Sequence, residues 1–136
     1  PFGKAAIKRK GNDVTVVALA KMVHEALHVA DELESKGISV EVIDPRTLVP
    51  FDKRTVIRSV KKTGRLVVVD EACQTCGAAG EIIAFVTTDP YVFPRLKAAP
   101  VRVCGLDIPI PFSPPLERYA LPDRKKIAAA IRKVLD

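Results

Sequence analysis

The spacing of apolar residues along this chain changes several times, and each change predicts a new strand or helix. Short runs rich in valine and other apolar residues predict buried strands over residues 14–19, 38–43, 66–69 and 101–104. Between these runs, apolar residues recur every three or four positions, which predicts helices over residues 22–36, 52–64, 77–87 and from 123 onwards. Continuous apolar strands that alternate with amphipathic helices are typical of a parallel sheet covered on both faces.

Single residues mark the ends of several of these helices. Asp52 and Asp123 stand where a carboxylate can cap the first turn of a helix. Gly37 and Gly64 stand where helices commonly end, because glycine readily adopts the left-handed conformation of that position. The predicted helices are therefore bounded at both ends by residues that favour those boundaries.

Two further segments complete the predicted organisation. Residues 5–9 are joined to the first buried strand by a Gly-Asn-Asp turn and predict an antiparallel strand at the edge of the sheet. Residues 107–122 are rich in proline and predict an irregular excursion between the last strand and the last helix. Because no repeat or flexible linker interrupts the order, we expect residues 1–136 to form a single α/β domain.

Composition narrows the class of protein. The chain has 136 residues, of which 48% are hydrophobic and 28% charged, which is typical of a folded domain and excludes a disordered chain. No apolar run approaches the ~20 residues that a membrane-spanning helix needs, so we expect no membrane partner. The chain begins with proline and lacks the apolar leader of a secretory signal, so we expect a processed chain or a fragment of a longer one.

The net charge of +6 lies mainly in residues 1–13 and 91–136, whereas the middle of the chain is slightly acidic. Nucleic-acid binders gather cations on one element and interleave aromatic residues. Here aromatic residues are only 5% of the chain and tryptophan is absent. The charge therefore indicates solvated ends and argues against a nucleic-acid partner.

The cysteines offer the sharpest local motif. Cys73 and Cys76 form a Cys-x-x-Cys pair between a predicted strand and a predicted helix, where a helix dipole lowers thiol pKa values. This placement motivates an alternative function as a small redox-active α/β domain. The competing interpretation is two small residues in a tight turn of a protein from a reducing compartment. A zinc site would need two more ligands, and Cys104, His24 and His28 are the soft candidates.

Ligands of open parallel sheets bind beyond the carboxyl ends of the strands. Asp44, Asp70 and Glu71 lie at these ends, and His24 begins the following helix with His28 one turn later on a polar face. No glycine-rich phosphate loop and no nucleophile elbow occurs. The residues by themselves therefore predict a fold and no complete active site, with no catalytic, cofactor-binding or metal-binding residue assigned.

Several segments taken together resemble one known family. They are VHEAL at 23–27, VIDPRTLVPFD at 42–52, SVKKTGRLVVV at 59–69, GEI at 80–82 and APVRV before GLDIP at 99–109. Their order and spacing resemble the C-terminal, transketolase-C-like domain of the β subunit of thiamine-diphosphate-dependent 2-oxo acid dehydrogenases. That family decarboxylates pyruvate, branched-chain 2-oxo acids or acetoin. The resemblance covers essentially the whole chain.

The resemblance implies a three-layer α/β/α fold with a five-stranded mixed sheet of order 1-3-2-4-5, in which strand 1 is antiparallel. It implies that this chain is part of a longer β subunit of an α2β2 heterotetramer. The cofactor, thiamine diphosphate with magnesium, then belongs to the full enzyme and not to this domain alone, which we expect to be inactive in isolation. The implied location is the cytoplasm, or the mitochondrial matrix in a eukaryote.

The resemblance assigns this domain to assembly and docking. Lys97 and Asp136 are the residues implied for docking of the peripheral subunit-binding domain of the lipoyl acyltransferase. The apolar side chains Ile108, Ile110 and Phe112 are expected to meet a neighbouring subunit or cover an edge.

This sequence also departs from the family pattern. Asp70 replaces a histidine, Ala78 lies where the family often has an aromatic residue, and the cysteine pair is not a family feature. Some pyruvate-type members carry an acidic residue where Lys97 stands. Lysine there is closer to acetoin-type or branched-chain-type members.

Overall fold

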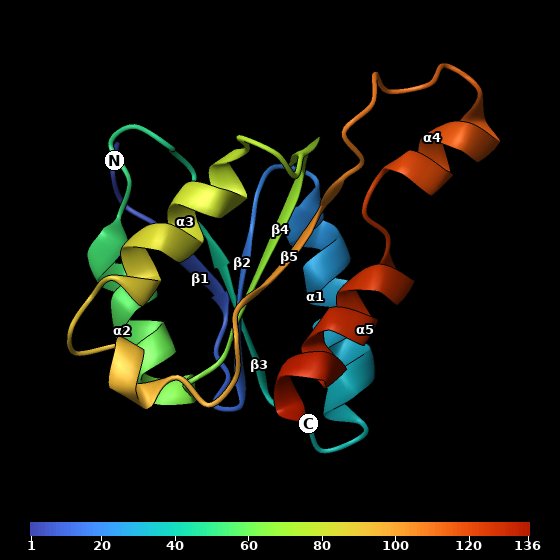
Figure 1. The fold of residues 1–136 in the computed structure, drawn as a ribbon. Coiled ribbons are helices and arrows are strands. Elements are labelled where there is room, and N and C mark those ends of the chain that lie inside the picture. The colour runs from blue at the N-terminus through green and yellow to red at the C-terminus, as the bar shows by residue number, and fades with distance from the viewer.

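The computed structural model describes residues 1–136 and shows three layers, with a sheet between two pairs of helices (Figure 1). The strands are β1 (Ala6–Arg9), β2 (Val14–Ala18), β3 (Val40–Asp44), β4 (Leu66–Cys73) and β5 (Val101–Gly105). They lie in the order β1-β3-β2-β4-β5. β1 pairs antiparallel with β3, and all other pairs are parallel. The predicted fold class, strand order and antiparallel edge are therefore confirmed.

Helices cover both faces of the sheet. α1 (Met22–Glu34) and α5 (Arg124–Leu135) pack on one face, and α2 (Lys53–Thr63) and α3 (Ala78–Thr87) pack on the other. Successive strand residues enter opposite cores: Val42 packs with α1 and α5, and Ile43 packs with α2 and α3. This two-sided burial explains why apolar residues occupy successive positions in the strands and do not strictly alternate with polar ones. No helix combines the length and apolar character that a membrane crossing requires.

The predicted helix boundaries are close to the observed ones. The Asp52 carboxylate accepts a hydrogen bond from the Thr55 N–H at 3.2 Å, and the Asp123 carboxylate accepts one from the Lys126 N–H at 2.8 Å. Gly64 ends α2 with φ +72°, and a Cβ there would lie 2.8 Å from the Arg95 carbonyl oxygen. Both carboxylate caps and the glycine terminus thus act as the sequence predicted.

Three features of the secondary structure were not fully predicted from the sequence. β4 continues to Cys73, four residues beyond the predicted end. The proline-rich segment is not wholly irregular, because it contains the helix α4 (Pro114–Ala120), and a short 3₁₀ turn, η1 (Phe93–Arg95), also escaped prediction. Proline is compatible with the first turn of a helix, where its missing N–H would have no partner, so the prolines start α4 and do not prevent it.

The segment of residues 106–121, here called the arm, leaves the end of β5 and projects beyond the three layers before the chain returns to α5 (Figure 1). It includes α4. The carboxyl ends of β2, β3, β4 and β5 lie on the side of the molecule from which the arm projects, here called the carboxyl edge. The opposite side, where these strands begin, is called the amino edge.

Candidate functional site: two edges of the sheet

A surface depression of about 810 Å³ lies at the carboxyl edge, where the order of the strands reverses between β2 and β4. Its lining residues come from the ends of three strands and the start of α3: Leu19, Ala20, Asp44, Pro45, Arg46, Thr47, Leu48, Asp70, Ala72, Cys76, Gly77 and Ala78. Asp44 and Asp70 therefore lie where the sequence placed them. Glu71 lines other depressions nearer the arm, and His24 and His28 are exposed on α1.

The backbone around this depression is unusual. Ala20, Arg46 and Cys76 have φ values of +48°, +62° and +58°, and they are the only non-glycine residues of the chain with positive φ. All three line the same depression. Such conformations are unfavourable for residues with a Cβ and concentrate at functional sites. The carboxyl edge is thus the part of the molecule with the clearest mark of a constrained, functional surface.

The depression does not fit thiamine diphosphate and magnesium. Arg46 is the only cation in its lining, whereas Asp44 and the nearly buried Asp70 are both acidic. The Asp70 carboxylate already accepts a hydrogen bond from the Ala72 N–H at 3.1 Å. No group of three or more His, Cys, Asp or Glu side chains is arranged to hold a metal ion. The donor set therefore repels a diphosphate more than it attracts one.

The cysteine pair has a different geometry from the one that the sequence suggested. Cys73 is the last residue of β4, and only Cys76 immediately precedes the N-terminus of α3. Both thiols are free and exposed. Burial and the nearby Asp70 carboxylate raise the pKa of the half-buried Cys104 to about 11. Since Cys73 does not lie at the helix N-terminus, the helix dipole that motivated the redox hypothesis acts on one thiol at most.

The loop between the two cysteines fastens the arm to the body. The Asp107 carboxylate accepts hydrogen bonds from the Thr75 N–H at 3.0 Å and from the Thr75 hydroxyl at 2.5 Å. These bonds hold the pKa of Asp107 below its usual value. The two ends of the arm are also joined to each other, because the Leu106 N–H donates to the Ala120 carbonyl at 3.0 Å. The arm is therefore a closed loop held at its base.

The apolar side chains of the arm have few partners within the chain. Phe112 is fully exposed, Ile110 is 60% exposed, and Ile108 is 44% exposed. Within α4 only Ala120 is buried, which leaves Leu116 and Tyr119 largely in solvent. Monomeric proteins rarely leave such a set of large apolar side chains uncovered. The side chains that the sequence analysis expected to meet a neighbouring subunit are thus exposed on the arm, and their contact with such a subunit stays a prediction.

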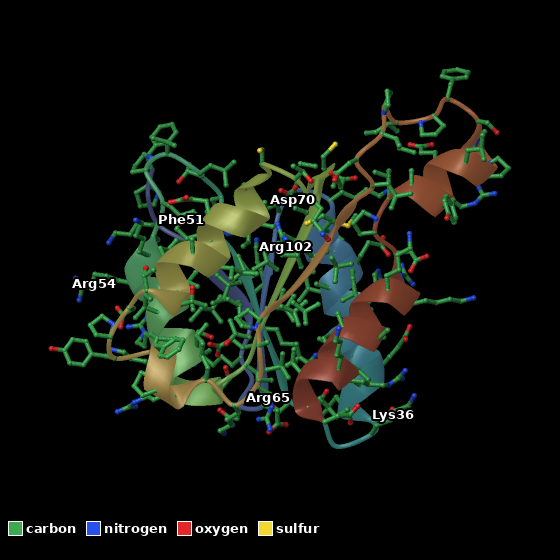
Figure 2. The ribbon with its side chains drawn as sticks, in the orientation of Figure 1. Lys36, Phe51, Arg54, Arg65, Asp70 and Arg102 are labelled. Atoms are coloured by element: carbon green, nitrogen blue, oxygen red, sulfur yellow. The ribbon has the colours of Figure 1, made fainter.

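A second apolar surface lies on the same edge, beside α3. A groove of about 340 Å³, here called the groove, is lined by Leu48, Val49, Pro50, Phe51, Lys53, Ala78, Glu81, Ile82 and Phe85. Phe51 and Phe85 pack edge to face in it, with ring centres 5.2 Å apart. Figure 2 shows Phe51 on the side of α2 and α3, away from the arm. The sequence analysis did not identify this groove, because its two walls are about 30 residues apart along the chain.

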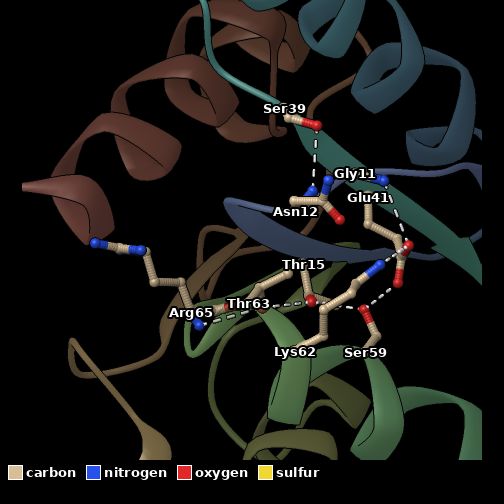
Figure 3. A network of polar contacts seen from close by, with 9 residues as sticks. All are labelled: Gly11, Asn12, Thr15, Ser39, Glu41, Ser59, Lys62, Thr63 and Arg65. Carbon is tan, nitrogen blue, oxygen red and sulfur yellow. Dashed lines mark hydrogen bonds and ion pairs between the residues drawn. The ribbon is translucent and has the colours of Figure 1, made fainter.

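The amino edge holds a buried polar network that sequence analysis also missed (Figure 3). Glu41, only 2% exposed, accepts hydrogen bonds from Ser59 and Lys62, each at 2.5 Å. The Thr15 hydroxyl contacts the hydroxyls of Ser59 at 2.7 Å and Thr63 at 2.9 Å. One signal was available: Glu41 interrupts an apolar strand, and a carboxylate in such a strand needs partners.

The electrostatics of this network are favourable. Burial by itself would raise the pKa of Glu41, but hydrogen bonds from Lys62, Ser59 and the Gly11 N–H outweigh burial and hold it below 4.5. The carboxylate is therefore charged and fully partnered, and it ties β3 to α2. The network stabilises the fold and offers no free group for chemistry.

Lys97 and Asp136 also lie at the amino edge. The Lys97 N–H donates to the Gly64 carbonyl at 2.8 Å, and the adjacent Arg65 side chain donates to the Val134 carbonyl at 2.7 Å. The turn at 64–65 thus lies between Lys97 and the last turn of α5, and both Lys97 and Asp136 are exposed. Figure 2 shows Arg65 at the opposite end of the molecule from Asp70. The structure therefore places the proposed docking residues on one edge and the arm on the other.

The chain was compared with known families and curated proteins. The family described as "Transketolase, C-terminal domain" matches residues 3–127. The β subunit of acetoin:2,6-dichlorophenolindophenol oxidoreductase from Cupriavidus necator is 48% identical over 99% of this chain and 39% of its own length. The pyruvate dehydrogenase E1 component subunit β from Acholeplasma laidlawii is 46% identical over 98% of this chain and 40% of its own length. The chain thus spans about two fifths of the length of these relatives.

Further comparisons agree. The mitochondrial pyruvate dehydrogenase E1 component subunit β-1 from Arabidopsis thaliana is 43% identical over 98% of this chain and 36% of its own length. Among solved structures, one described as a split gene transketolase, inactive beta4 tetramer, superposes with a TM-score of 0.79 at 29% identity. The superposition covers 98% of this chain and 42% of that one.

Proposed function

The chain belongs to the transketolase C-terminal domain family, and from this premise we propose that it is the C-terminal domain of the β subunit of a 2-oxo acid or acetoin dehydrogenase. Homologues of this chain are subunits of oxidoreductases. In this proposal the full α2β2 enzyme uses thiamine diphosphate and magnesium to decarboxylate its substrate oxidatively and passes the acyl group to the lipoyl acyltransferase. It works in the cytoplasm or the mitochondrial matrix.

The role proposed for this domain is assembly, and the arm is the observation that carries it. Ile108, Ile110 and Phe112 are exposed on a loop that is nevertheless held at its base by Asp107 and Thr75. A fixed loop with uncovered apolar side chains is suited to bind another subunit, because less conformational entropy is lost on contact. The beta4 assembly named for the solved relative supports self-association of β-type chains.

The second proposed role is docking of the acyltransferase at the amino edge, through Lys97 and Asp136. If the chain ends at Asp136, this residue offers two carboxylates that an arginine fork of the partner can engage. Lys97, Arg132 and Lys133 are cationic and exposed, and they weaken the attraction for a basic partner. The amino edge is otherwise satisfied internally, so docking there leaves the assembly edge free.

Reconstitution of the complete polypeptide that carries this chain with an α-type subunit tests the assembly role. We expect oxidation of acetoin or pyruvate only in the mixture with thiamine diphosphate and magnesium, and loss of both assembly and activity in Tyr119→Asp. Tyr91→Asp is the matched control, because Tyr91 lies outside the arm and both tyrosines are 70% exposed. Equal behaviour of the two variants would contradict assembly through the arm.

Binding of the isolated peripheral subunit-binding domain to the reconstituted enzyme tests the docking role. Deletion of Asp136 should weaken this binding several-fold, because it removes the carboxylates that pair with arginine, and Lys97→Asp should strengthen it. Glu34→Ala, a change of an exposed carboxylate on α1, serves as control. If deletion of Asp136 and Lys97→Asp both leave the dissociation constant unchanged, docking lies elsewhere.

A further inference from the structure

Two apolar surfaces of this chain have no partner within it, and both lie on the carboxyl edge. One is the arm, with Phe112 at its tip, and the other is the groove between residues 48–51 and α3. We propose that the arm of one copy docks into the groove of a second copy, and that the second arm docks reciprocally into the first groove. This inference rests on the assembly role proposed above and names the surface that receives the arm.

The arm has the properties of an inserted element. Phe112, Ile110 and Ile108 follow one another at every second position, separated by prolines that stiffen the backbone. The base is closed by the Leu106–Ala120 hydrogen bond and by Asp107 with Thr75. A rigid, apolar loop tip with a tied base needs little ordering when it binds, so most of its buried area contributes to affinity.

The groove has the properties of a receiving surface. Its floor is formed by Phe51, Phe85 and Ile82, and its outer wall by Val49, which is 92% exposed. Lys53 and Glu81 provide polar groups of opposite sign in the lining. An apolar centre with a polar rim is the usual anatomy of a protein–protein contact.

The charges next to both surfaces favour a second copy over a strongly acidic or basic partner. The groove lining carries one cation and one carboxylate, Lys53 and Glu81. α4 also carries one of each, Arg118 and Glu117. With Asp107 included, the arm carries one net negative charge and the groove lining none. Neither surface therefore presents a strong field that would select a highly charged partner, and opposite charges can pair on each side of an arm seated in a groove.

The positions of the two surfaces allow two identical contacts. The groove lies on the face of the sheet that α2 and α3 cover. The arm leaves from β5, the edge strand opposite β1, and projects on the side of α1 and α5 (Figure 1). A twofold axis across the carboxyl edge exchanges these two sides, so each arm lies over the groove of the other copy. Such an interface closes after two copies and forms no fibre.

The available area is adequate for a stable contact. A buried aromatic side chain removes roughly 150–250 Å² from solvent, and the arm offers Phe112 and Tyr119 in addition to Ile108, Ile110 and Leu116. With the groove of the same copy added, each partner approaches the ~800 Å² that specific complexes bury.

Photo-cross-linking tests the proposed occupant directly. The complete polypeptide is prepared with p-benzoylphenylalanine in place of Phe112, mixed with its α-type subunit and with an isotope-labelled copy of itself, and irradiated. We expect adducts between differently labelled copies, mapped by mass spectrometry to residues 48–51 or to Ile82 and Phe85. Adducts on the α-type subunit, on the same chain or on another face of the second copy would overturn the proposal.

A reciprocal charge exchange tests the same contact by affinity. Phe112→Glu and Val49→Lys change highly exposed side chains, so neither should impair folding. Each alone should weaken self-association at least tenfold in sedimentation equilibrium, and the double variant should regain most of the loss, because each Glu then meets a Lys of the other copy. Phe93→Glu, at an exposed phenylalanine outside both surfaces, should leave association unchanged.

The pattern of results separates this inference from the proposed function. If Phe112→Glu dissociates the copies and Val49→Lys does not, the arm binds elsewhere: the groove is overturned and the assembly role stands. If neither variant weakens association, both the groove and assembly through the arm are overturned. Failure of the reconstituted enzyme to oxidise acetoin, pyruvate and branched-chain 2-oxo acids would overturn the proposed function and leave the measured contact standing.

Discussion

The amino edge and the carboxyl edge of the same sheet differ in how completely their side chains find partners within the chain. At the amino edge, Glu41 is buried but accepts hydrogen bonds from three donors, and the hydroxyls around it bond one another. At the carboxyl edge, Phe112 and Val49 are exposed apolar side chains with no comparable partners. Positive φ values at non-glycine residues also occur only there.

This difference indicates which edge contributes to the stability of the domain and which to its contacts with other chains. Satisfied polar groups and buried apolar groups lower the free energy of the folded chain by themselves. Exposed apolar groups on a fixed arm contribute little to that free energy until another surface covers them. The amino edge should therefore control unfolding, and the carboxyl edge should control association.

The largest expected difference between the edges concerns unfolding. Glu41→Ala leaves buried hydroxyl groups without an acceptor and should lower the free energy of unfolding by about 2 kcal/mol. Phe112→Ala removes a fully exposed side chain and should change it by no more than about 0.5 kcal/mol. Urea denaturation of both variants, at concentrations where the chains are monomeric, measures these values. A larger loss from Phe112→Ala would reverse the assignment of the two edges.

The pH dependence of stability sharpens this prediction. Because the folded pKa of Glu41 lies below its unfolded value of 4.5, its contribution is present above pH 4.5 and is lost as the pH falls through the folded pKa. Glu41→Gln, which cannot titrate, should show a shallower loss of stability over that acidic range. Asp31→Asn, a change at an exposed carboxylate of α1 that pairs with Arg9, is the control. Parallel pH profiles for wild type and Glu41→Gln would contradict the prediction.

A third expected effect is a difference in reactivity among the three thiols of the carboxyl edge. Cys73 and Cys76 are exposed, whereas burial and the nearby Asp70 carboxylate raise the pKa of Cys104 to about 11. At pH 8 a thiol reagent should therefore modify Cys73 and Cys76 in a fast phase. Its reaction with Cys104 should be slower by a factor of about ten or more, because less of that thiol is ionised. Cys104→Ser should leave the fast phase unchanged. A disulfide between Cys73 and Cys76 under reducing conditions, with reductase activity, would instead revive the redox alternative.

The last prediction concerns cofactor binding by this chain alone, where we expect no measurable signal. Titration of this chain alone with thiamine diphosphate and magnesium should release no heat of binding, because the depression presents Asp44 and Asp70 with a single cation, Arg46. The complete α2β2 enzyme is the positive control. Sub-micromolar binding by this chain alone would show that the carboxyl edge is a cofactor site as well as a contact surface.

The sequence predicted most of the fold, because its signals were local. Apolar residues at successive strand positions, as in Val42 and Ile43, follow from burial on both faces of the sheet. Asp52 caps a helix through bonds to a residue three positions away. α4 was missed because the proline content of residues 107–122 predicts an irregular segment, although prolines at residues 114–115 suit the first turn of a helix. The end of β4 was missed because Asp70 and Glu71 interrupt its apolar run.

The sequence alone was therefore sufficient for the order of the elements, for their caps and for the family resemblance. Each of these depends on neighbouring residues or on whole segments. Only the tertiary structure decided that Ser59 and Lys62 meet Glu41, that Ala20, Arg46 and Cys76 line one depression, and that Asp107 fastens the arm to Thr75. These contacts join residues far apart along the chain. These contacts form only after the strands have paired and the helices have packed. A local sequence pattern does not specify which distant side chains the strand order and helix placement will bring together.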